Sequence, residues 1–452
     1  MLSIRLSRRR IVAFGALLAV LNLLALWGTH LARTFWRDVQ WWPAQFLGLQ
    51  IDLARENNPA VWYASMVLFA ASLAMLACFA ADRRESWTRG GRILTFGWLI
   101  GAAMFALLSL DEAGSLHERI NSVASTVGVP DALRIDSPGW VGVLAIPIAL
   151  AGALLVAFAW FRVRHVPVAF VLMTAGTLLF LSVPVQEHIE VTRWIEGGET
   201  HDARHTLSVL AEEGTELFGA LFFLAGAAWY AFVRTEQRRR FEPGIGNRES
   251  GIGIPIPSDW RTIAGAIALL ATGMLAVEFA LPEVMTFRPG STRGIPQNWF
   301  PAALALLVAA VSLAIAGLHR RENRPRQSTA YLLFGLAHLA LSIDHGSAHE
   351  FTQDMLSDSP RKRLATDITL ALLLALVAGL FATVAARVGV GLLAVAWLAL
   401  VLLPFVVGSA LRPALGFVAY ALVLPTLVTG AREPHRAAAA SSGASARLAA
   451  RA

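Results

Sequence analysis

Long uninterrupted apolar segments recur along the whole chain and indicate its fold class. A transmembrane helix needs about 20 predominantly apolar residues, and twelve segments meet this criterion. They are residues 10–30, 59–81, 91–112, 139–161, 167–187, 205–233, 261–281, 299–318, 328–349, 364–386, 388–407 and 411–430. The pattern predicts an all-α polytopic membrane protein with about 12 transmembrane helices.

Composition and charge agree with this interpretation. The chain has 452 residues, of which 56% are hydrophobic and 15% are charged, whereas soluble domains have about 25% charged residues. The net charge of +7 comes from Arg in short loops and tails, as membrane topology requires, so we expect no nucleic-acid partner. The chain has one cysteine, Cys78, which excludes an intrachain disulfide.

Arginine clusters between the apolar segments predict the topology. They fall at residues 8–10, 83–92, 162–164, 234–240, 320–326 and 432–436, at every second boundary between predicted helices. Because cytoplasmic loops are enriched in Lys and Arg, this spacing predicts a multi-pass plasma (inner) membrane protein with both termini cytoplasmic. Residues 361–363, "RKR", fall on the opposite side and go against the pattern.

Several short motifs occur twice in the same order. "LSLDEAGSLHE" begins at Leu108 and "LSIDHGSAHE" at Leu341, each at the end of an apolar segment. "DSP" occurs at 136–138 and 358–360, while "DRRE" at 82–85 is echoed by "HRRE" at 319–322. The repetition predicts two parallel six-helix halves, residues 1–233 and 261–430. A cytoplasmic linker, 234–260, joins them, and a disordered cytoplasmic tail, 431–452, follows.

Acidic and histidine side chains gather at one side of the predicted membrane. The helices at 91–112 and 167–187 end there and the helix at 205–233 begins there, so their polar residues converge. Carboxylate oxygens and imidazole nitrogens are ligands of zinc and iron. The predicted metal ligands are Asp111, His117, Glu118, Glu187, His188, Glu212 and Glu216, and the predicted catalytic residues are Glu213 and His205.

The predicted helix at 328–349 repeats this polar pattern in the second half. Its candidate second site consists of His338, Asp344, His345, His349 and Glu350. Acids and histidines at helix ends are often only solvated interfacial residues. However, Glu216 and His338 lie a turn or more inside apolar sequence, where ionisable groups are costly and usually functional. Together with the convergence of several helices, this favours a site.

Two functions fit these residues. The first is a metal-dependent enzyme with one or two zinc or iron ions, either a hydrolase or a di-iron-type oxidoreductase. The position near the outer leaflet predicts a lipid or lipid-linked substrate that arrives from the membrane. The alternative is a proton- or ion-coupled transporter that uses the same Glu and His residues as a relay. The polar residues gather at one face rather than at the membrane midplane, which favours the enzyme.

Overall fold

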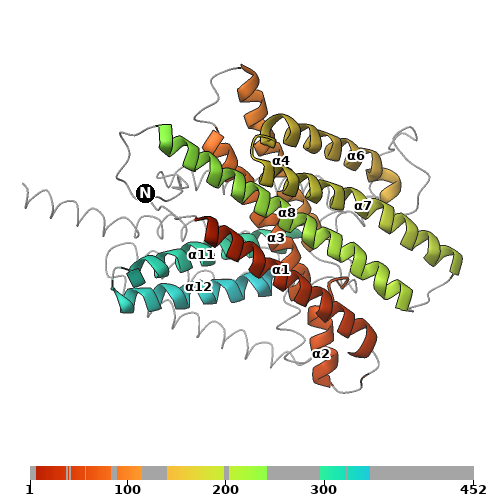
Figure 1. Cartoon of the computed structure of the whole chain (residues 1–452). Helices are drawn as coiled ribbons and strands as arrows, with labels where there is room; N and C mark the ends of the chain where they lie inside the picture. Colours follow the sequence, from red (N-terminus) through yellow and green to blue (C-terminus); the bar gives the residue numbers. More distant parts are fainter. Residues whose placement is uncertain are drawn as a thin grey trace, which may run out of the picture.

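The computed structural model shows an almost entirely helical protein (Figure 1). It describes residues 7–36, 39, 42–55, 58–82, 89–114, 140–197, 203–241, 296–321 and 323–346. The predicted segments 261–281, 364–386, 388–407 and 411–430 and the predicted tail lie outside the described residues.

The described helices follow the predicted apolar segments closely. They are α1 (Arg8–Leu31), α2 (Trp42–Ile51), α3 (Pro59–Asp82), α4 (Arg89–Gly114), α6 (Val141–Phe158), α7 (Pro167–Gly197), α8 (Ala203–Phe241), α11 (Pro296–Arg321) and α12 (Pro325–Gly346). Short π-helical segments extend α1 (Ala32–Trp36) and α6 (Ala159–Val163). Eight of the twelve predicted segments are therefore described in whole or in part, and each of them forms a helix.

Local sequence explains where several helices begin. Proline is the first residue of α3, α7, α11 and α12, a position where its missing N–H is not needed. Asn58 caps α3, because its Oδ1 accepts a hydrogen bond of 2.9 Å from the Val61 N–H. Ser7 caps α1 in the same way.

Seven of the described helical segments are long and apolar enough to cross a membrane. The chain is therefore a multi-pass membrane protein. The eighth described segment, α12, carries His338 and Ser342 and is not among the seven. The count of twelve spans and the two-half layout stay predictions.

Two features of the helices were not predicted. The short helix α2 follows α1 and returns the chain toward α3. Helix α8 continues to Phe241, so the first residues of the predicted linker 234–260 are helical. Glu, Gln and Arg are good helix formers, so the polar sequence after residue 233 extends the helix instead of ending it.

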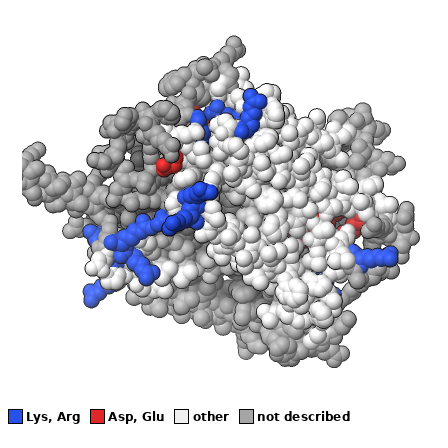
Figure 2. Space-filling model, in the orientation of Figure 1, with Lys and Arg blue, Asp and Glu red and all other residues white. Residues whose placement is uncertain are grey.

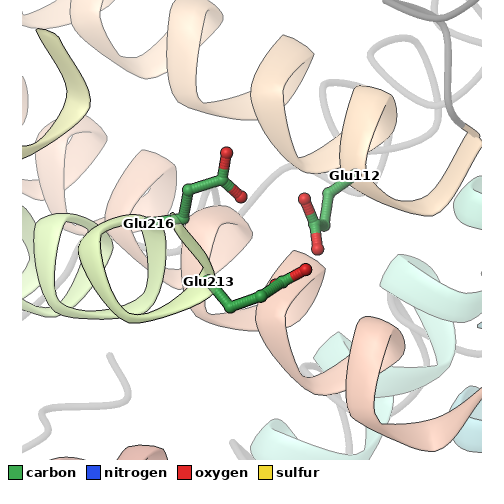
Figure 3. Close-up of side chains that lie close together, drawn as sticks. All are labelled: Glu112, Glu213 and Glu216. Carbon is green, nitrogen blue, oxygen red and sulfur yellow. The ribbon is translucent and has the colours of Figure 1, made fainter. Parts of the chain in front are cut away.

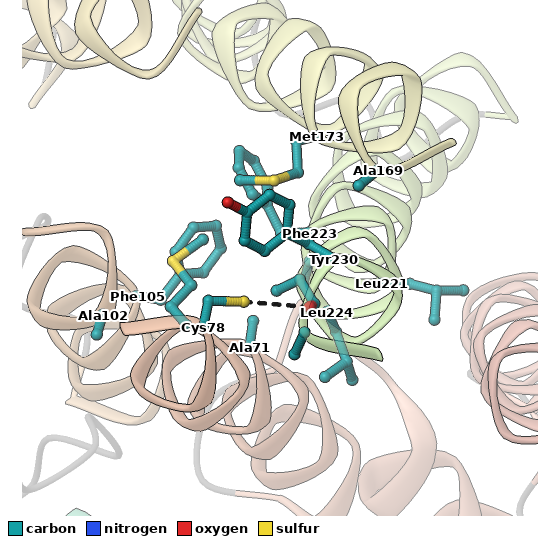
Figure 4. Close-up of a cluster of buried hydrophobic side chains, with 14 of the residues drawn as sticks. Ala71, Cys78, Ala102, Phe105, Ala169, Met173, Leu221, Phe223, Leu224 and Tyr230 are labelled. Atoms are coloured by element: carbon teal, nitrogen blue, oxygen red, sulfur yellow. Dashed lines mark hydrogen bonds between the residues drawn. The ribbon is translucent and has the colours of Figure 1, made fainter. Parts of the chain in front are cut away.

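The core of the described part lies among α3, α4, α7 and α8 (Figure 4). Its largest fully buried side chains include Trp98, Phe105, Phe223 and Tyr230. Helices α7 and α8 approach closely at Gly176 and Gly219, where a Cβ at Gly176 would lie 3.0 Å from the Gly219 carbonyl oxygen. The glycine on α8 therefore serves helix contact, since a small residue lets two helix backbones approach closely.

The bundle has two chemically different ends. At the acidic end, α4 and α7 finish and α8 begins, and the carboxylates described below gather there. At the basic end, α1 and α4 begin and α8 finishes, with Arg8, Arg162 and Arg234 nearby. In the view of Figure 2, most of the described surface consists of uncharged residues, and few charged side chains are visible. Such a surface is expected of a protein surrounded by lipid.

Helices α11 and α12 form a hairpin that contacts α3 and α4. The Trp62 indole N–H donates to Ser342 Oγ at 3.0 Å, and that hydroxyl donates to the Ala302 carbonyl at 2.6 Å. One serine thus connects α3, α12 and α11.

Candidate functional site

Three carboxylates meet at the acidic end of the bundle (Figure 3). Glu112 lies in the last turn of α4, and Glu213 and Glu216 lie near the start of α8. One oxygen from each carboxylate lies within 4.8 Å of one oxygen from each of the others. Residues three apart share a helix face, so α8 presents two carboxylates to the one supplied by α4. This arrangement can place three oxygen ligands around one cation.

A second carboxyl pair lies beside this cluster. Glu187 of α7 and Glu212 of α8 line the cavity described below. Because like charges held close together repel, protons or a cation between these carboxylates would stabilise the group. The carboxylate group at this end is therefore built to hold positive charge.

A chain of polar contacts borders the carboxylates. The Arg33 Nε lies 3.0 Å from Asp52 Oδ1, and its Nη1 lies 3.5 Å from His205 Nε2. The His205 Nδ1 lies 3.0 Å from Glu190 Oε1. The other Glu190 oxygen, Oε2, is buried and has no hydrogen-bond partner within the described part of the chain. These contacts place His205 between an acid and a guanidinium.

Apart from Asp52, these groups line one cavity of about 690 Å³ between α3, α4, α6, α7 and α8. Its described lining contains seven acids, namely Asp111, Glu112, Glu187, Glu190, Glu212, Glu213 and Glu216. Within this lining, only Arg33 and His205 carry basic groups. The charged side chains of the lining are near the acidic end, and the remainder of the wall is largely apolar.

Most of the predicted site residues that the structure describes are brought together. Asp111, Glu187, His205, Glu212, Glu213 and Glu216 all line the cavity. His188 does not line it, because a one-residue step on a helix turns the side chain by about 100° from that of Glu187. His117 and Glu118 lie outside the described residues.

The candidate second site is described only at His338. This side chain is buried in α12, where its Nδ1 lies 2.9 Å from the Phe334 carbonyl oxygen and its ring centroid lies 4.2 Å from that of Phe334. The side chains of Asp344, His345, His349 and Glu350 lie outside the described residues.

Four residues of the site were missing from the predicted set. Glu112 and Glu190 lie in the same short polar segments as the predicted ligands, so the local sequence could have indicated them. Arg33 and Asp52 lie on either side of α2. They meet because α2 folds the chain back, and no periodicity in the sequence indicates that contact.

A different cluster of charged groups, around Asp82, lies at the basic end of the bundle. The buried Asp82 carboxylate accepts hydrogen bonds from Trp98 Nε1 at 2.8 Å, Arg162 Nε at 2.8 Å and the Tyr230 hydroxyl at 3.0 Å. Arg234 Nε donates to its other oxygen at 3.3 Å. Burial and the charges of Arg234 and Arg162 lower the pKa of nearby His165. Asp82 is enclosed by donors, so its role is to join helices.

Comparison with known proteins identifies one similarity. Residues 11–230 match the model of a domain of unknown function, DUF8692. No curated protein and no solved structure matches the chain. The matched residues run from α1 into α8 and include every described residue that lines the cavity.

Proposed function

We propose that the chain is a membrane metalloenzyme that acts on a lipid or a lipid-linked substrate. The observation that carries the proposal is the approach of the Glu112, Glu213 and Glu216 oxygens to within 4.8 Å of one another. Three carboxylates in one partly buried site repel each other unless a cation or protons lie between them. One or two zinc or iron ions fit this donor set.

The residues divide into two proposed roles. Glu112, Glu213 and Glu216 hold one ion, and Asp111, Glu187 and Glu212 line the same cavity and are proposed to complete the site or to hold a second ion. Glu213, which the sequence assigned to catalysis, is here proposed as a ligand.

His205 is the proposed proton carrier, since its two ring nitrogens face Glu190 and Arg33. Arg33 and Glu190 would hold the imidazole in place at the cavity wall. A bound zinc would supply a water acidic enough to attack a substrate, and two iron ions would supply oxygen chemistry. The identity of the metal therefore decides the reaction: zinc would make the protein a hydrolase, and two iron ions would make it an oxidoreductase.

The proposed membrane placement puts the acidic end at the outer leaflet of the plasma (inner) membrane and both termini in the cytoplasm. The arginines at the opposite end support it, because Arg8, Arg162 and Arg234 lie where positive residues should face the cytoplasm.

We also propose that the chain consists of two parallel halves. Ser109 Oγ donates to the Ser65 carbonyl at 2.7 Å, which ties α4 to α3. Ser342, at the same place in the second copy of the motif, donates to the Ala302 carbonyl at 2.6 Å and ties α12 to α11. The same serine therefore makes the same kind of contact in both hairpins, which supports an origin by duplication.

Metal content tests the proposed function directly. Protein purified in mild detergent without chelator is analysed for metals beside Glu213→Gln, Glu216→Gln and the control Glu236→Gln. The control removes a carboxylate from the other end of the same helix. We expect one or two equivalents of zinc or iron in the wild type and the control. Each cluster variant should lose at least one equivalent while remaining folded in the membrane, with a melting temperature below that of the wild type because the bound ion stabilises the folded state.

Absence of metal from all four folded proteins would overturn the enzyme proposal. The alternative, proton- or ion-coupled transport, would then gain weight, because Asp52, Arg33, His205 and Glu190 form a continuous chain of charged or titratable groups. Flux measurements in liposomes would follow.

A further inference from the structure

We infer that the cavity binds a membrane lipid with one acyl chain inside the protein and its headgroup against the carboxylates. The inference rests on the proposed function for the headgroup, while the acyl-chain site stands on its own geometry. The part of the cavity that would take the chain is called the apolar arm. Its lining includes Met104, Pro147, Ala151, Leu155, Thr177 and Phe223.

The length of the apolar arm suits one leaflet of a bilayer. Ten residues of α7 separate Glu187 at the acidic end from Thr177 in the arm, which is about 15 Å of helix. Along α8, Glu216 and Phe223 are about 10 Å apart by the same rise. Half of the roughly 30 Å hydrocarbon core of a bilayer is about 15 Å. An acyl chain that enters with its headgroup at the acidic end therefore fits the depth of the arm.

The chemistry of the arm favours hydrocarbon over any polar ligand. Its one hydroxyl among the residues named above, Thr177 Oγ1, already donates to the Met173 carbonyl at 2.9 Å. The other five side chains contain only carbon, hydrogen and the Met104 sulfur. Burying a polar group without a hydrogen-bond partner costs several kcal/mol, so a sugar or peptide would be disfavoured here. The polar end, by contrast, offers seven carboxylates within the same cavity.

Helix α6 forms the wall between the apolar arm and the membrane. It packs on α7 at Gly152, where a Cβ would lie 2.5 Å from a Leu181 methyl, and on α4 where the Trp98 and Phe158 rings are 4.8 Å apart. The second contact lies toward the basic end. Nearer the acidic end, side chains of α4 and α6 face the cavity. A chain can therefore arrive sideways between these two helices.

The outer faces of the same two helices present lipid-facing side chains. Leu107 of α4 is 63% exposed, and Leu150 and Leu154 of α6 are 61% and 70% exposed. Cavity-lining and lipid-facing positions thus alternate within a few residues on each helix. This alternation supplies matched pairs of substitutions that fill the arm or leave it open.

The test uses the full-length protein in bilayer nanodiscs of phosphatidylethanolamine and phosphatidylglycerol. The probe is phosphatidylethanolamine with a diazirine near the terminal methyl of one acyl chain. After illumination, mass spectrometry locates the labelled peptides. We expect label inside the apolar arm, on residues 147–155 at cavity-facing positions, near Thr177 and at Phe223.

Two pairs of variants make the result decisive. Ala151→Trp fills the arm from α6, while Ala153→Trp places the same ring on an exposed position of that helix. Met104→Trp fills it from α4, and Leu107→Trp is its exposed control. Since overpacking disfavours a bound chain, we expect arm labelling to fall about tenfold in Ala151→Trp and Met104→Trp. Both controls should label like the wild type.

Equal labelling in filled and control variants, or label only on lipid-facing residues such as Leu150, would overturn the acyl-chain site. The pairs on α4 and α6 act independently, so a folding failure of one filled variant leaves the other to decide. Labelling of the Glu213→Gln variant separates this inference from the proposed function. If the metal site and the acyl-chain site are both correct, Glu213→Gln loses metal and is still labelled in the apolar arm. If the wild type contains no metal but is labelled in the apolar arm, only the metal site is overturned. If it contains metal but is not labelled in the arm, only the acyl-chain site is overturned.

Discussion

Asp82 is the residue on which most long-range contacts of the basic end depend. Its carboxylate is fully buried and accepts hydrogen bonds from Trp98 on α4, Arg162 after α6, and Tyr230 and Arg234 on α8. A buried carboxylate needs this many donors, because an unpaired ion inside the protein is strongly disfavoured. One side chain therefore joins α3 to three other parts of the bundle.

Replacing Asp82 by Asn should destabilise the protein by about 3 kcal/mol, because it leaves two guanidinium groups without their anion. Thermal unfolding in detergent, followed by circular dichroism, measures the change. Trp98→Phe removes one neutral donor and should cost only about 1 kcal/mol. Combining Asp82→Asn with Arg162→Gln should cost less than the sum of the two single changes. Strict additivity would show that the ion pair contributes nothing to stability.

At this scale the sequence identified five of the seven cavity carboxylates, but not Glu112, Glu190 or the partners Arg33 and Asp52. Glu212 and Glu213 were found because the polar residues of several predicted helix ends converge, and Glu216 because an ionisable residue inside apolar sequence is unusual. Asp82 appeared only as part of a repeated motif, since it follows an apolar segment and looks like an ordinary helix end. Its burial depends on Arg162 and Arg234, which lie 80 and 152 residues away in the chain. No local pattern contains that information.

Helices α7 and α8 show how glycine positions determine the packing of a pair of elements. A Cβ at Gly176 would lie 2.8 Å from Phe223 Cδ2 and 3.0 Å from the Gly219 carbonyl oxygen. Further along, a Cβ at Gly226 would lie 3.2 Å from the Ala169 carbonyl oxygen. The two backbones approach closely because both helices have a glycine at the first point and α8 has one at the second. This contact fixes α8, which carries three of the cavity's carboxylates, against α7.

Gly176→Ala should therefore destabilise the protein by about 1–3 kcal/mol, as overpacking typically does. The matched control is Gly15→Ala on α1, where a Cβ would have nothing within 4 Å. That change should be neutral or stabilising by up to about 1 kcal/mol, since Ala favours helix over Gly. Comparison of the two melting temperatures separates packing from helix propensity, and equal effects would contradict the packing argument.

The positions of the described helices could largely be predicted because a transmembrane helix is specified by an uninterrupted apolar length. Their polar extensions could not. Helix α7 continues to Gly197 and α8 to Phe241, well beyond the apolar sequence. There the helix is maintained by residue propensity and tertiary contacts, such as the one between Glu190 and His205. Hydropathy detects neither effect.

The described part of residues 1–241 contains the larger described core and the cavity. The described core cluster among α3, α4, α7 and α8 runs from Leu18 to Ala231. The similarity to the domain of unknown function covers residues 11–230. The helices α11 and α12 contact this part from outside, through α3 and α4. These three observations mark residues 1–241 as a candidate folding unit.

We expect a chain of residues 1–241 to insert into membranes and unfold cooperatively by itself. Its core keeps every buried contact of the cluster, and it loses the hydrogen bond from Trp62 to Ser342. Size-exclusion chromatography and thermal unfolding in detergent measure the outcome. Trp62→Phe in the full-length protein removes the same hydrogen bond and serves as the reference. Aggregation of the 1–241 chain beside a stable Trp62→Phe protein would show that the second part is required for folding.

The buried position of Cys78 gives the whole molecule a convenient property for solution work. It is the single cysteine of the chain, and its Sγ lies in the core, 3.1 Å from the Ala227 carbonyl oxygen (Figure 4). A water-soluble maleimide cannot reach this thiol while the helices stay packed. The folded native chain therefore does not react with such a reagent. A cysteine introduced in a loop is then the thiol that reacts, and its labelling reports which side of the membrane the loop faces. The rate at which Cys78 itself becomes labelled reports how often the bundle opens.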